Sequence, residues 1–139
     1  MFNKPDKLLP VFLWLVSLHS FFVGIGLIFL PASAFEFLGF APTFERFFST
    51  QGGVFHFAMS VAYAMAAYDL IKNQQLIVFS ITVKFLATVF LIIYFVFISH
   101  QWLIIFSAVT DMLMGMVILF LYKKLETENY FKKELHGNA

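Results

Sequence analysis

Each of four apolar stretches in this sequence has a side chain near its middle that can ionise or donate a hydrogen bond. These side chains are His19, Tyr63, Lys84 and Asp111. An isolated charge at the centre of a membrane helix costs about 2.5 to 3.5 kcal/mol, so such residues usually face a protein interior and often serve function. Because Lys84 and Asp111 carry opposite charges, we expect them to pair. All four are candidates for a ligand-binding site.

Helical spacing adds a histidine to this set. His56, Ser60 and Tyr63 follow each other in steps of four and three, which places them on one face of a helix. Counted from the ends of the apolar stretches, His19, Tyr63, Lys84 and Asp111 fall within about two turns of one depth. We therefore predict one polar layer that four helices build together.

The segment Gln51-Gly52-Gly53 precedes His56 and opens the expected second helix. Glycines let a backbone or a ligand come close, and free N–H groups at a helix start tolerate an anion. The expectation is a ligand-binding site formed by His19, Gln51, His56, Tyr63, Lys84 and Asp111, reached from the extracytoplasmic side past Gln51. Two simpler readings stay open: the glycines serve only tight packing, and the Lys84–Asp111 pair only fixes two helices.

Other chemistries lack their sequence signals. The chain has no cysteine, which excludes disulfides, thiolate metal sites and cysteine nucleophiles. No pair of ligands has the spacing of a metal site on a helix, and no nucleophile-elbow or phosphate-loop sequence occurs. We predict no catalytic residue, no metal and no cofactor, and nothing indicates nucleic-acid binding.

The composition indicates that lipid surrounds the chain. Of its 139 residues, 61% are hydrophobic and only 12% are charged, with 21 phenylalanines. The mean hydropathy is +0.87. About 25% charged residues is usual for a soluble domain, so this chain lacks the polar surface that water requires.

Four apolar runs predict the elements that position the polar layer, at about 8–30, 52–71, 76–98 and 102–122. About 20 residues span the hydrocarbon core, and in lipid the backbone must satisfy its own hydrogen bonds, so we expect helices. The first run is too long for the apolar core of a signal peptide and is expected to be retained. The fold class predicted is an all-α, four-helix transmembrane bundle, a single domain with a tail at 123–139.

The connection between the first two helices, residues 31–51, is long and aromatic. Its six phenylalanines favour a segment that lies in the membrane interface, and a lid over a cavity between the helices is the alternative. Ser33 with Glu36 predicts a capped start of a short helix, and Gly39 predicts its end.

The cations predict the orientation of the chain. Seven of the nine Lys and Arg residues lie on the side of both termini and the 72–75 turn, namely Lys4, Lys7, Lys72, Lys123, Lys124, Lys132 and Lys133. Arg46 is on the other side, and Lys84 is inside the third run. Because positively charged loops stay in the cytoplasm, both termini should be cytoplasmic.

The four-helix layout resembles the small DoxX-like and BphX-like membrane proteins. The features that carry this resemblance are Pro31 at the end of the first helix, the loop "FEFLGF" and the entry "RFFSTQGG" to the second helix. It implies a small integral protein of the bacterial inner membrane. Some members of that group are subunits of membrane oxidoreductases, and the resemblance assigns no functional residue here.

These observations predict binding or conduction of a small ligand through the polar layer, linked to protonation of a histidine, rather than catalysis. The partners expected are membrane lipid, a small-molecule ligand, and a second copy or a larger membrane complex. Two alternatives stay open. One is an accessory subunit that stabilises a membrane complex, and the other is a membrane-embedded enzyme acting on a lipid-like substrate.

The orientation can be tested by cysteine accessibility, because the chain has no cysteine of its own. A cysteine at Glu45 should react with an impermeant thiol reagent only from outside, and one at Asn138 only from the cytoplasm. Labelling of either position from the opposite side would contradict the predicted topology.

Overall fold

All regular structure in the described part of the chain is helical. The computed structural model describes residues 4–40 and 45–131. Within these ranges the helices are α1 (Pro5–Phe29), α2 (Ala32–Phe37), α3 (Phe47–Tyr68), α4 (Gln74–Phe97) and α5 (Trp102–Thr127). Three of them, α1, α4 and α5, are long and apolar enough to cross a membrane. The all-helical class and the membrane location are thus supported, and the crossing of α3 stays a prediction.

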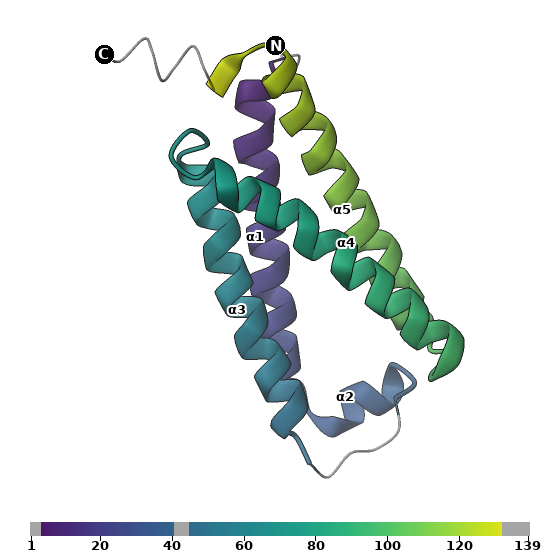
Figure 1. The fold of residues 1–139 in the computed structure, drawn as a ribbon. Helices are drawn as coiled ribbons and strands as arrows, with labels where there is room; N and C mark the ends of the chain where they lie inside the picture. Colours follow the sequence, from purple (N-terminus) through teal and green to yellow (C-terminus); the bar gives the residue numbers. More distant parts are fainter. Residues whose placement is uncertain (1–3, 41–44, 132–139) are drawn as a thin grey trace.

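The long helices form two pairs. α1 runs along α3, and α4 runs along α5, as Figure 1 shows. The pairs meet at the end of the molecule where α1 begins and α5 ends, called the terminal end below. They diverge toward the opposite end, called the loop end, where α2 lies between them (Figure 1).

Local sequence explains where α1 begins and ends. Pro5 opens the helix, where its missing N–H group would have no partner in any case. Pro31 follows the last turn and prevents its continuation. The Arg46 guanidinium, just before α3, then donates to the carbonyl oxygens of Ile28 and Leu30 at 2.9 and 2.7 Å. This contact ties the start of α3 to the end of α1.

The connection between α1 and α3 contains the short helix α2, with a different start from the one expected. α2 begins at Ala32 after Pro31, and no side chain caps it, so Ser33 lies inside the helix and the predicted capping box is wrong. The proline sets the start because its fixed backbone is already suited to a helix entry. Gly39 follows α2 with φ +92°, which confirms the predicted stop.

The turn between α3 and α4 is closed by side chains at the terminal end. An oxygen of Asp69 accepts hydrogen bonds from the N–H groups of Lys72 and Ile71. The Lys72 bond is the main reason why the pKa of Asp69 lies below its ordinary value. The Asn73 amide donates to the Met65 carbonyl oxygen at 2.9 Å, which caps α3. These contacts make the turn compact.

Glycines allow α1 and α3 to approach closely near the loop end. A Cβ atom added at Gly53 would lie 2.8 Å from the carbonyl oxygen of Gly24, and one at Gly24 would lie 2.8 Å from the Phe57 ring. Either distance is shorter than atoms tolerate. In lipid no hydrophobic effect drives helices together, so close packing between small residues is what stabilises such crossings.

The apolar core lies toward the terminal end. Side chains from all four long helices are fully buried there, namely Leu9, Leu13, Ala66, Ile77, Ile118 and Leu125. Toward the loop end of α4 the apolar side chains are exposed instead, as Phe90 at 61% and Phe97 at 79% illustrate. In the loop-end half of α4 these apolar side chains therefore contact the surroundings of the protein rather than another helix.

The glycine contact gives a matched pair of variants. Gly53→Ala should lower the free energy of unfolding by about 1–3 kcal/mol, the usual cost of overpacking, because the added methyl group meets a backbone oxygen. Gly52→Ala should have little effect, since its nearest neighbour is the flexible Leu27 side chain at 3.6 Å. Denaturation of the detergent-solubilised protein measures both, and equal losses would contradict the packing described.

Candidate functional site

The two intramembrane charges form an ion pair between α4 and α5. Lys84 Nζ lies 2.5 Å from Asp111 Oδ1, and the two side chains are 6% and 17% exposed. Gly115 makes room for the lysine stem, because a Cβ there would lie 3.1 Å from Lys84 Cβ. The predicted pairing of Lys84 with Asp111 is confirmed, and it holds α4 and α5 in one rotational setting.

Tyr63 links α3 to this pair. Its side chain is only 1% exposed, and Lys84 Nζ lies 5.5 Å from the centre of its ring. A cation at this distance is attracted by the electron-rich ring face. The lysine thus has an anionic partner on α5 and an aromatic partner on α3, so three helices converge on one ammonium group.

A second polar group lies between α1 and α3. Ser17 Oγ donates to the Ser60 carbonyl oxygen at 2.8 Å, and Ser20 Oγ donates to that of His56 at 3.0 Å. Ser20 Oγ is also 3.2 Å from His56 Nδ1. The two α1 serines were not among the predicted site residues. Their spacing of three, continued by Gly24, forms a stripe of small residues that could have indicated this helix contact.

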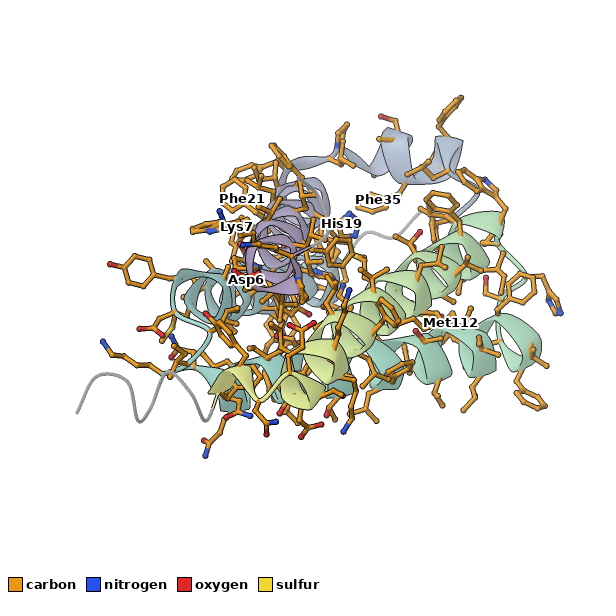
Figure 2. All side chains as sticks on the ribbon, turned by 90° about the horizontal axis from the view of Figure 1, so that it is seen from above. Asp6, Lys7, His19, Phe21, Phe35 and Met112 are labelled. Carbon is orange, nitrogen blue, oxygen red and sulfur yellow. The ribbon has the colours of Figure 1, made fainter. Side chains whose placement is uncertain are left out.

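Both predicted histidines lie within electrostatic reach of the ion pair. The charges of Lys84 and Asp111 act on His19 and on His56. His56 is half-buried and His19 is exposed. In Figure 2 His19 projects from α1 toward the side on which Phe35 of α2 lies, opposite to Phe21. The structure therefore gathers His19, His56, Tyr63, Lys84 and Asp111 in one region.

Gln51 lies outside this region. α3 begins at Phe47 rather than near residue 52, so Gln51 is in its second turn, and the side chain is exposed. At 1.5 Å per residue it is about 18 Å along the helix from Tyr63. The N–H groups of residues 51–53 are inside the helix and do not form its free start. Gly53 packs on α1, which agrees with the packing interpretation of the glycines.

Several polar atoms of the gathered residues have no partner among the described residues. They are the Asp111 Oδ2 oxygen, the His19 ring nitrogens, His56 Nε2 and the Tyr63 hydroxyl. No side-chain nitrogen or oxygen in the described ranges is both fully enclosed and unpaired. None of these atoms is therefore completely enclosed, although Tyr63 is almost fully buried and only His19 is exposed. Together they offer unused hydrogen-bonding capacity.

A shallow hollow of about 300 Å³ lies elsewhere, at the terminal end. It is lined by Gln74, Gln75, Val78 and Tyr122, and Gln74 Nε2 donates to the Tyr122 hydroxyl at 2.9 Å. Gln74 is ten residues before Lys84 on α4, or about 15 Å along the axis. This hollow is distinct from the polar layer and holds none of the predicted residues.

Comparison with protein-family models, curated proteins and solved structures finds no match to this chain. What the site can do has to follow from its own residues.

A double-mutant cycle tests the ion pair. Lys84→Met or Asp111→Leu alone should cost about 3–5 kcal/mol of unfolding free energy, because the remaining charge is buried without its partner. The double variant should recover much of this loss. The exposed pair Lys123–Glu126, at 2.6 Å, serves as the control and should show no measurable coupling. Additive effects at Lys84 and Asp111 would mean that the pair does not form.

Proposed function

We propose that this chain is a four-helix integral membrane protein that binds a small ligand at the layer formed by His19, His56, Tyr63, Lys84 and Asp111. The observation that carries the proposal is the group of accessible, unpartnered polar atoms around the ion pair. Such atoms are costly in a membrane unless something hydrogen-bonds to them. A bound ligand would satisfy them.

The proposal includes α3 as a fourth crossing. Its 22 residues reach about 33 Å, enough for the hydrocarbon core. Its polar residues Ser60 and His56 turn toward α1, where Ser17 and Ser20 donate to their carbonyl oxygens. Packing of this kind lets a helix of moderate hydropathy cross beside a more apolar one.

Binding is better supported than conduction. Between the polar layer and the terminal end, the space among the helices is filled by fully buried apolar side chains such as Leu9, Leu13, Ile77 and Ile118. A polar ligand or ion would have to pass this dry core, and burying it without partners is costly. With the termini in the cytoplasm, the layer would open toward the outer half of the membrane.

The second candidate is an accessory subunit of a membrane complex, in line with the resemblance to DoxX-like proteins. The same unpartnered atoms favour it, because a helix of a neighbouring subunit could hydrogen-bond to them as well as a ligand could. In that case the isolated chain would hold no small molecule.

Extraction of the purified protein distinguishes these candidates. A small molecule should be retained at about one per chain by the wild-type protein and depleted about tenfold in His19→Phe, since one hydrogen bond to the ligand is removed. The Phe120→Leu variant, on an exposed face of α5, should retain it fully. Identical extracts from all three proteins would overturn the binding proposal and favour the subunit.

A further inference from the structure

One face of α1 changes from covered to exposed along its length. Leu8, Phe12, His19 and Phe22 follow at steps of four, seven and three, which places them on one face of the helix. Leu8 and Phe12 pack against the buried core. His19 is exposed, and Phe22 is 64% exposed. A neighbouring helix therefore covers this face of α1 near the terminal end and no longer covers it at the level of His19.

The helix that diverges from α1 is α5. Met114, Ile118 and Leu125 belong to the buried core, whereas Asp111, one turn closer to the loop end than Met114, is only partly buried. α2 lies at the loop end between the pairs, but its residues are exposed or only partly buried, and it leaves His19 exposed. Figure 1 shows the same divergence of α1 from α5. The face of α1 with Leu15, His19 and Phe22 is therefore uncovered where α1 and α5 diverge, and this uncovered face is called the opening below.

The walls of this opening are apolar, and its innermost groups are polar. Leu15 and Phe22 flank His19 and are exposed at 56% and 64%. Asp111 Oδ2, which Lys84 leaves unpaired and which is not completely enclosed, is the acceptor that α5 contributes near this level. In a bilayer an opening with such walls is filled by hydrocarbon rather than water. What reaches His19 must therefore be soluble in lipid.

The charges restrict the ligand further. The ammonium of Lys84 and the carboxylate of Asp111 neutralise each other at 2.5 Å. A ligand with a net charge would find no opposite charge to pair with at this depth, and an unpaired charge inside a membrane costs much free energy. A neutral group with an O–H or N–H bond can donate to Asp111 Oδ2 and accept from or donate to the His19 ring.

We propose that the ligand is a neutral, lipid-soluble molecule with a hydroxyl or amide head, and that it enters sideways from the bilayer between α1 and α5. This inference rests on the proposed function and names the ligand class and the route. Entry between α1 and α5 takes the place of the predicted entry past Gln51. The close contact between Gly53 of α3 and Gly24 of α1 leaves no space for a ligand there.

Spin labels test the route without knowledge of the ligand. A nitroxide on Phe22→Cys in vesicles should collide often with oxygen and rarely with a water-soluble nickel chelate, like a label on the lipid-exposed Phe120→Cys. A label on Lys72→Cys, whose native side chain is 84% exposed in the terminal turn, should show the reverse. If Phe22 behaves like Lys72, the opening is aqueous. If neither reagent reaches it, protein covers the opening. Either result overturns sideways entry and leaves ligand binding itself intact.

A photoreactive diacylglycerol, with the reactive group on its acyl chain, tests the ligand class. Crosslinks should concentrate on the facing stretches of α1 and α5 and fall about tenfold in His19→Phe, the usual loss for one hydrogen bond. The same reactive chain on a fatty-acid anion should show no such concentration, and Phe120→Leu should leave the pattern unchanged. Equal labelling by both probes, or labelling spread over all exposed helix faces, would overturn the inference.

Discussion

Two opposite charges on neighbouring apolar helices have to meet, and the rest of this structure is arranged around that requirement. Lys84 and Asp111 can each be placed only where the other lies within contact distance, because lipid offers neither charge a partner. Their contact sets how α4 and α5 are rotated, and Gly115 supplies the space for it. Tyr63 then draws α3 to the same ammonium group.

The two helix pairs are joined by different physical means. α1 and α3 touch through glycines and serines, whose small side chains let the backbones approach and share hydrogen bonds. α4 and α5 are held by the ion pair and by the Thr88 hydroxyl, which lies 3.4 Å from the carbonyl oxygen of Ala108 on α5. The pairs meet each other mainly through the apolar core near the terminal end. The polar layer consequently lies where this core stops.

That position is the reason why His19 enters the proposed site. An imidazole in the middle of an apolar helix would normally be turned inward, yet here it is exposed, within electrostatic reach of an ion pair whose carboxylate keeps one unpaired oxygen. A purely structural pair would be expected to complete its hydrogen bonds within the protein. The incomplete set, from helices that diverge at this level, is the physical basis for proposing a ligand.

The sequence alone determined the helical class, the approximate helix ranges and the pairing of Lys84 with Asp111, because hydropathy and charge act locally and can be read from spacing. It did not determine that α3 begins at Phe47, that Gly53 packs on Gly24, or that His19 is exposed. Those features depend on how helices far apart in the sequence rotate and cross. Side-chain fit between facing surfaces decides such angles, and only the tertiary structure contains that fit.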